Sequence, residues 1–221
     1  MLEAPFYSVD GQFAIDLPGA QAVFTTRSWG DVRETADEIG SRLGVAPVRP
    51  RQVHGNRFLQ LETDPPTGVL VDIEADAILT ARSGVAPMVM TADCLPIAVA
   101  AGGAVAAIHA GWRGLDSAVI AGAVGRLKEL APDEPLTAAI GPAAGACCYE
   151  VGAELRERFA GFSTGTNLDL KAIARTQLEA AGVATIHETG ICTICSDPAL
   201  LFSYRRDGVQ TGRQALLTWL T

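Results

Sequence analysis

Basic residues are in the minority in this chain of 221 residues. It has 17 Lys and Arg against 25 Asp and Glu, which gives a formal net charge of −8. Proteins that bind a nucleic-acid backbone need a basic surface, because much of their affinity comes from releasing counterions from the phosphates. We therefore expect no nucleic-acid partner.

The sequence also lacks an uninterrupted apolar run. Its most apolar stretch, residues 85–112, is broken by two prolines, an aspartate and a Gly-Gly pair, whereas a membrane helix needs about 20 consecutive apolar residues. Residues 1–5 lack the basic and apolar blocks of a signal peptide. We therefore expect a cytoplasmic protein with no membrane partner.

Linkers, low-complexity segments and internal repeats are absent as well, so we expect one continuous domain over residues 1–221. Apolar periodicity and capping residues predict helices at residues 31–43, 116–130, 152–160 and 169–181. Strands are predicted at residues 20–26, 73–80, 88–91, 95–101, 104–109, 183–187, 201–205 and 214–220. This mixture favours an α+β fold with mixed β-sheets flanked by helices over a regular alternation of strands and helices.

Two short apolar segments flank Gly102-Gly103, a pair typical of a tight antiparallel hairpin. If the two glycines form the turn, Pro96 faces His109 across the hairpin. Cys94 then lies on the same face of the sheet as His109. Diagonal neighbours of this kind are about 7–8 Å apart at the backbone, which suits a thiolate and an imidazole that bind one ion at about 2.0–2.3 Å.

A cysteine and a histidine in this arrangement have three interpretations. They are consistent with two metal ligands, with a nucleophile and its general base, or with a buried thiol beside a hydrogen-bonded core histidine. His54, in a polar segment at residues 52–56, is on its own most simply a solvated loop residue. Together with Cys94 and His109 it would complete a set of three ligands with one open position, the arrangement of a catalytic zinc ion.

Seven sequence blocks closely resemble the laccase-domain family, long described as multicopper polyphenol oxidoreductases and now as zinc-dependent purine nucleoside phosphorylases. The blocks are QVHG (52–55), TADCLP (91–96), HAGWRGL (109–115), GP (141–142), YEVG (149–152), CT (192–193) and FSYRRD (202–207). The resemblance implies that His54, Cys94 and His109 bind Zn²⁺. It also implies phosphorolysis of adenosine, inosine, guanosine and methylthioadenosine, with purine nucleoside and phosphate as partners and adenosine deamination as a further activity.

The older family description implies copper-dependent oxidation of phenols. This chain has only three histidines, too few for the imidazole ligands of a multicopper centre. Two segments also depart from the family pattern: Ser28-Trp29-Gly30 replaces a Gly-Gly-Val-Ser block and a Leu-Asn motif, and Ala143-Ala144 replaces Cys or Ser and Ile. Both leave the metal ligands intact and alter one expected wall of the substrate site.

Phosphorolysis of an N-glycosidic bond brings a dianion to a ribose that develops positive charge, so the site needs cationic side chains. Arg113 is the main candidate, because a planar guanidinium binds phosphate oxygens in pairs; its alternative is a structural ion pair. The predicted catalytic residues are therefore Cys94, His109 and Arg113. Weaker candidates for contact with substrate or phosphate are Arg27, Gln52, Asp93, Tyr149, Arg205 and Arg206.

Some of these candidates have structural alternatives. Asp93 adjoins a metal ligand, and we expect it to accept hydrogen bonds beside the site rather than to act as a general acid. Tyr149 and Glu150 would contact a sugar hydroxyl or, in the slightly preferred interpretation, cap the following helix. A metal-independent cysteine hydrolase, such as an amidase acting on cell-wall precursors with Cys94 and His109, is the main rival function, and a non-enzymatic binding module is another.

The remaining cysteines give weaker indications. Five cysteines are an odd number, and in a reducing compartment they are not expected to form a disulfide framework. Cys147 and Cys148 are adjacent and are expected to pack in the interior rather than to bind one ion. Cys192 and Cys195 form a single CxxC, for which a structural role is the preferred interpretation.

Overall fold

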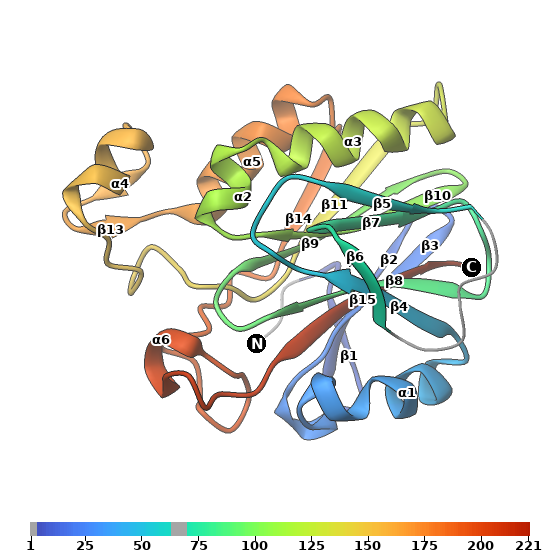
Figure 1. Ribbon diagram of the computed structural model, residues 1–221, viewed down its shortest axis with the longest axis horizontal. Helices are drawn as coiled ribbons and strands as arrows, with labels where there is room; N and C mark the ends of the chain where they lie inside the picture. Colours follow the sequence, from blue (N-terminus) through green and yellow to red (C-terminus); the bar gives the residue numbers. More distant parts are fainter. Residues whose placement is uncertain (1–3, 63–69) are drawn as a thin grey trace.

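The computed structural model describes residues 4–62 and 70–221. Two β-sheets are stacked, with helices on the outer face of each (Figure 1). Each sheet combines parallel and antiparallel strand pairs. This confirms the predicted α+β class with mixed sheets. Residues 1–3, on which part of the signal-peptide argument depends, lie outside the described residues.

Within the described residues, one sheet has six strands and the other seven. The six-stranded sheet contains β5 (Phe58–Leu61), β7 (Ala77–Thr80), β9 (Leu95–Ala101), β10 (Ala104–Ala110), β11 (Leu136–Ile140) and β14 (Thr185–Glu188), in the order β14-β11-β9-β10-β7-β5. The seven-stranded sheet contains β1 (Tyr7–Val9), β2 (Gln12–Leu17), β3 (Ala20–Phe24), β4 (Ala46–Arg51), β6 (Leu70–Glu74), β8 (Val85–Thr91) and β15 (Gln214–Leu220), in the order β1-β2-β3-β15-β8-β4-β6. A small hairpin pairs β12 (Ser163–Thr164) with β13 (Asn167–Leu168).

Helices cover both outer faces. The six-stranded sheet packs against α2 (Trp112–Asp116), α3 (Val119–Leu130) and α5 (Leu170–Ala180), and the other sheet packs against η1 (Arg27–Trp29) and α1 (Val32–Leu43). The short helices α4 (Ala153–Arg158) and α6 (Tyr204–Asp207) lie toward the left-hand end of the view in Figure 1. Each described helix is too short or too polar to cross a bilayer.

The alternation of side chains along β10 decides where its histidine points. Ala106 and Ile108 pack beneath the helices, whereas Val105 and Ala107 face the other sheet. His109 belongs to the second set, because successive side chains of a strand point to opposite faces. It therefore lies between the two sheets, at the end of the strand.

Several predicted elements are confirmed. Helix α1 begins after Asp31, whose side chain accepts a hydrogen bond from Arg33 N, and ends at Gly44 in the left-handed conformation. The hairpin of β9 and β10 has the predicted register, from Ala101 opposite Ala104 to Pro96 opposite His109. Local turn and cap chemistry was sufficient to place both elements.

Other predictions were wrong in detail. The helix predicted at 116–130 is α3, which begins only at Val119 because Ala118 has a left-handed backbone (φ 64°); the short helix α2 before it was not predicted. Residues 73–80 divide into β6 and β7, which belong to different sheets. Residues 201–205 form no strand; instead Ser203 caps α6 by accepting a hydrogen bond from Arg206 N. Seven of the described strands were not predicted from the sequence: β1, β2, β4, β5, β11, β12 and β13.

Candidate metal centre

Three predicted ligands meet where β9 begins and β10 ends. Cys94 immediately precedes β9, His109 is near the end of β10, and His54 lies in the loop after β4. One ligand atom from each side chain lies within 4.8 Å of the other two. The two imidazole rings are 4.7 Å apart in an edge-to-face arrangement. The fold thus brings together side chains from three distant parts of the chain.

A buried aspartate between β6 and β7 holds two of these ligands in place. Asp76 Oδ1 lies 2.7 Å from His109 Nδ1. The same carboxylate accepts backbone hydrogen bonds from His54 N at 2.9 Å and Gly55 N at 2.6 Å, which stabilise the left-handed backbone of His54 (φ 61°). Because Nδ1 of His109 is occupied, its Nε2 is the nitrogen free to bind a metal.

The electrostatics of the cluster favour a thiolate. Burial raises the pKa of Cys94, but the charge and hydrogen bond of His109, helped by His54, outweigh this effect and lower the pKa to about 6. Burial lowers the pKa of His109, but Cys94 and Asp76 raise it to about 9. The pKa of Asp76 lies below its usual value, because the hydrogen bond and charge of His109 outweigh the opposing effect of burial. The surroundings of Cys94 therefore favour its thiolate, the form that binds metals or attacks electrophiles.

The donor set fits a metal ion. One thiolate and two imidazoles are ligands typical of zinc, and three protein ligands leave the fourth tetrahedral position to water or substrate. All three ligands also line a cavity of about 460 Å³. A small molecule in the cavity would therefore reach the open position.

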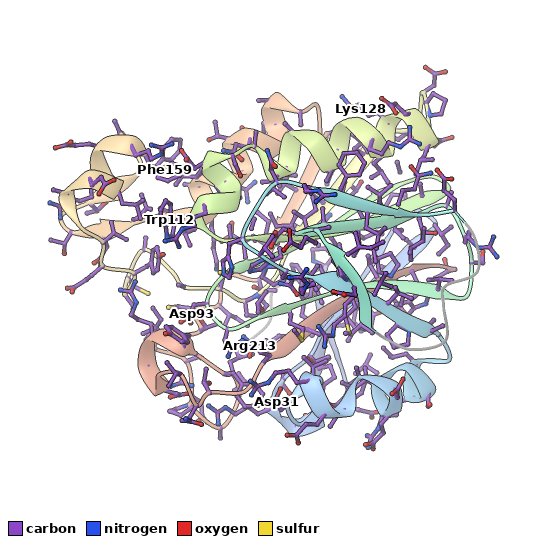
Figure 2. All side chains as sticks on the ribbon, in the orientation of Figure 1. Asp31, Asp93, Trp112, Lys128, Phe159 and Arg213 are labelled. Atoms are coloured by element: carbon purple, nitrogen blue, oxygen red, sulfur yellow. The ribbon has the colours of Figure 1, made fainter. Side chains whose placement is uncertain are left out.

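The walls of this cavity are rich in arginine and aromatic side chains. Beyond the ligands they include Trp112, Arg113, Tyr149, Tyr204, Arg205 and Arg213. In Figure 2, Trp112 lies at the start of α2, and Asp93 and Arg213 lie below it in the view, beside α6. Among the described lining residues the carboxylate is that of Asp93, so three guanidinium groups outnumber it and the cavity favours an anion.

Arg113 is the most available of these cations. Its guanidinium stacks over the ring of Trp112 at 4.2 Å and forms no ion pair with a described carboxylate. Arg205 stacks over Tyr149 at 4.8 Å and also donates to the backbone oxygen of Glu150 at 2.7 Å. The structural ion pair considered for Arg113 is therefore absent from the described part of the chain.

Asp93 and Gln52 line the cavity but are committed to structural hydrogen bonds. Asp93 accepts from Thr193 Oγ1 and from Arg205 N, both at 2.6 Å, in agreement with its interpretation as an acceptor beside the site. The amide of Gln52 both donates to Met90 O and accepts from Met90 N at 2.8 Å. Both residues shape the wall by fixing the backbone around it.

Arg27 and Arg206 are not among the described residues that line the cavity. Both form ion pairs with Asp207, and the hydrogen bond from Arg206 is the main reason why the pKa of Asp207 falls to about 2. The capping role preferred for Tyr149 and Glu150 is not observed, because the N-cap of α4 is Gly152 and no side-chain hydrogen bond caps this helix. Tyr149 instead faces the cavity.

Sequence reasoning missed Asp76, Arg213, Trp112 and Tyr204. The one available indication for Asp76 was a charged residue directly before the apolar run of β7. The prediction of one strand over residues 73–80 concealed it, because it placed this aspartate within a regular strand. Arg213 lies in a loop whose contact with the cavity depends on the packing of the carboxyl-terminal segment.

The chain is similar in sequence and fold to several known proteins. The family model described as multi-copper polyphenol oxidoreductase laccase matches residues 26–221. A Pseudomonas aeruginosa protein named purine nucleoside phosphorylase is 39% identical over 204 residues, which cover 86% of this chain and 80% of that protein. A Xylella fastidiosa protein, also named purine nucleoside phosphorylase, is 38% identical over 187 residues, 77% of this chain and 70% of that protein. The crystal structure of the Neisseria meningitidis protein NMB0706 matches with a TM-score of 0.80 and 30% identity over 96% of this chain and 99% of that one.

Proposed function

Because the chain belongs to the multi-copper polyphenol oxidoreductase laccase family, and its relatives named above are purine nucleoside phosphorylases, we propose that it is a zinc-dependent purine nucleoside phosphorylase. The proposed enzyme is one domain over residues 1–221 that accepts adenosine, inosine, guanosine and methylthioadenosine, with adenosine deamination as a second activity. The observation that supports it best is a set of three metal ligands at a cavity with cationic and aromatic walls.

The walls suit both substrates. A cavity of about 460 Å³ lies within the usual range of about 300–1,000 Å³ for small-molecule sites. Arg113, Arg205 and Arg213 provide positive charge for a phosphate dianion. Trp112 and Tyr149 provide flat surfaces on which a purine or ribose can pack.

The reaction divides between phosphate and nucleoside. A phosphate oxygen forms a bond to the anomeric carbon as the N-glycosidic bond breaks, and the purine leaves with the bonding electrons and takes up a proton. Arg113 would hold the phosphate in line with this carbon and offset its charge. When bound, the metal ion would supply Lewis-acid charge that orients phosphate or activates water.

A metal-independent cysteine hydrolase is the second candidate. The lowered pKa of Cys94 beside His109 also suits a nucleophile and its base. Such a dyad needs no third ligand, so it does not account for His54 beside both residues. Under this alternative, activity would survive a chelator, and Cys94 would be alkylated without prior removal of metal.

Chromatographic analysis of products tests the proposal. Zinc-loaded protein is incubated with adenosine in the presence and absence of phosphate, with a chelator-treated sample in parallel. We expect ribose 1-phosphate and adenine only when phosphate and zinc are both present, and inosine wherever deamination contributes. Absence of nucleoside turnover, or turnover that the chelator does not reduce, would contradict the proposal.

Replacing Arg113 by Ala is expected to lower kcat/KM for phosphate by about 10- to 100-fold, because one hydrogen-bonded charge pair contributes about 1.5–3 kcal/mol. Steady-state kinetics at varied phosphate concentration measure this effect. Arg42→Ala, which removes an exposed arginine from α1, is the matched control and should leave the constant unchanged. Equal constants for wild type and Arg113→Ala would reject the role of Arg113.

A further inference from the structure

Four cysteines outside the cavity form a second cluster. Cys147 and Cys148 lie in the loop after β11, and Cys192 and Cys195 lie in the loop after β14. Strands β11 and β14 are parallel neighbours, so both loops begin at the same end of the sheet. A parallel bridge between Ala143 and Cys192 extends the pairing of these strands into the two loops. We propose that these four cysteines form a structural tetrathiolate zinc site, separate from the site at His54, Cys94 and His109.

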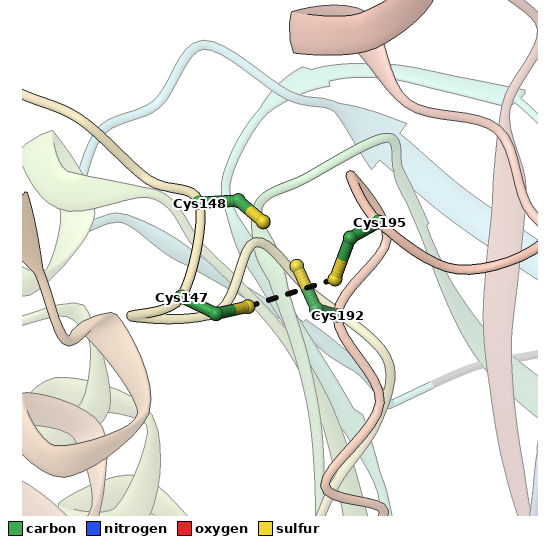
Figure 3. A group of neighbouring side chains, drawn as sticks. All are labelled: Cys147, Cys148, Cys192 and Cys195. Carbon is green, nitrogen blue, oxygen red and sulfur yellow. Dashed lines mark hydrogen bonds between the residues drawn. The ribbon is translucent and has the colours of Figure 1, made fainter.

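The distances between the sulfur atoms fit one ion. All four lie within 4.8 Å of one another, and Figure 3 shows the side chains directed toward one another from the two loops. Cys147 Sγ and Cys195 Sγ are 3.6 Å apart. Sulfur ligands at about 2.3 Å from a tetrahedral zinc ion lie about 3.8 Å apart, whereas a disulfide needs about 2.05 Å. The cluster therefore has the spacing of ligands around one ion, and its cysteines are free.

The backbone around Cys192 supports this interpretation. Gly145 N donates a hydrogen bond to Cys192 Sγ at 3.2 Å. Hydrogen bonds from backbone N–H groups stabilise a thiolate, the form that binds a metal. The spacing of Cys192 and Cys195 also matches one ligand pair of a structural zinc site.

The expectation that the adjacent pair packs in the interior is wrong. Cys147 is exposed and Cys148 is half-buried. Hydrogen bonds from Cys148 N and from Tyr149 N to Gly145 O form a tight turn. Because of this turn, the adjacent Cys147 and Cys148 can both direct their sulfur atoms toward Cys192 and Cys195. Lys171 and Arg175 line the same 340 Å³ hollow as Cys147 and Cys192, but both pair with Glu188 and Asp169 also lines it, so the hollow adds no net positive charge beside the cysteines.

Four protein ligands fill the coordination sphere of zinc, so this ion would have a structural role. Its position links two parts of the catalytic cavity. Cys148 directly precedes Tyr149, which lines the cavity, and Thr193, between Cys192 and Cys195, donates to Asp93. The inference does not depend on the proposed phosphorylase activity.

Metal analysis tests the proposal on full-length protein purified under reducing conditions without a chelator. We expect about two zinc ions per chain in wild type and about one in either Cys195→Ser or Cys94→Ser. Cys195 is exposed, so its substitution should be compatible with folding, and Cys94→Ser is the matched control that removes a thiolate from the other site. The loss of about half of the bound zinc in Cys195→Ser would be accompanied by a lower Tm.

Cobalt spectroscopy of Cys94→Ser gives a second readout that does not require a change in the cluster. Co²⁺ added to this variant should show the intense sulfur-to-metal charge-transfer bands of a tetrathiolate site. Any one of four results would overturn the proposal. These are equal zinc content in wild type and Cys195→Ser, a disulfide between Cys147 and Cys195 in the reduced preparation, bound iron in place of zinc, and absence of the cobalt bands.

Discussion

Asp76→Asn is expected to lower the zinc affinity of the His54–Cys94–His109 site by about 10- to 100-fold and the free energy of unfolding by about 3–5 kcal/mol. The carboxylate of Asp76 is fully buried and accepts four hydrogen bonds, from His109 Nδ1 and from three backbone N–H groups. An amide has the same shape but one acceptor oxygen, and its NH₂ group would face other donors. Competition with a zinc chelator and denaturant unfolding measure the two effects.

The control for this substitution is Asp72→Asn on the neighbouring strand. Asp72 pairs with Arg51, but its side chain is 88% exposed, and exposed ion pairs contribute only about 0–1 kcal/mol. This variant should keep the zinc affinity and nearly all of the stability of wild type. If Asp76→Asn matched it in both measurements, Asp76 would have no role in positioning the ligands.

Gly111→Ala is expected to reduce turnover by about 100-fold, although it adds only a methyl group. A Cβ at this position would lie 2.9 Å from Cys94 Sγ and 3.3 Å from His54 Cδ2, so at least one ligand must move. The backbone of Gly111 (φ −77°) is open to any residue, and the effect should therefore arise from displaced ligands rather than from backbone strain. A displacement of about 1 Å at a catalytic centre can cost about 100-fold in rate. Nucleoside turnover and zinc content measure the result.

Gly125→Ala in α3 is the matched control, because a Cβ there meets no atom within 4 Å. Alanine also has the higher helix propensity, by about 0.8–1.0 kcal/mol. We expect this variant to keep full turnover and to gain slightly in stability. Normal turnover and zinc content in Gly111→Ala would show that Cys94 and His54 do not have to keep their positions for the reaction.

The hairpin that carries two of the ligands was predictable because its determinants are local. Gly102 and Gly103 select a tight turn, and strand alternation then fixes which side chains share a face with His109. Helix α1 was predictable for the same reason, since Asp31 and Gly44 mark its ends. Pattern and turn chemistry were sufficient for both elements, because the residues that determine each of them lie within one short segment of the chain.

Asp76 and the four-cysteine cluster could not be placed in this way. Asp76 reaches His54 and His109 because β6 and β7 belong to different sheets and the chain crosses between them at this residue. The cysteine pairs meet because β11 lies beside β14, a parallel pairing between strands more than 40 positions apart. Neither arrangement has a local signature, since both depend on which strands become neighbours in the folded sheets.

The central claim is that one metal ion binds among His54, Cys94 and His109. Anomalous scattering from crystals of the zinc-loaded protein, recorded on both sides of the zinc absorption edge, tests it most directly. We expect a peak about 2.0–2.3 Å from one atom of each of the three side chains, with a fourth position open to the cavity. A map without this peak, from protein that still converts nucleosides in the presence of a chelator, would contradict the account.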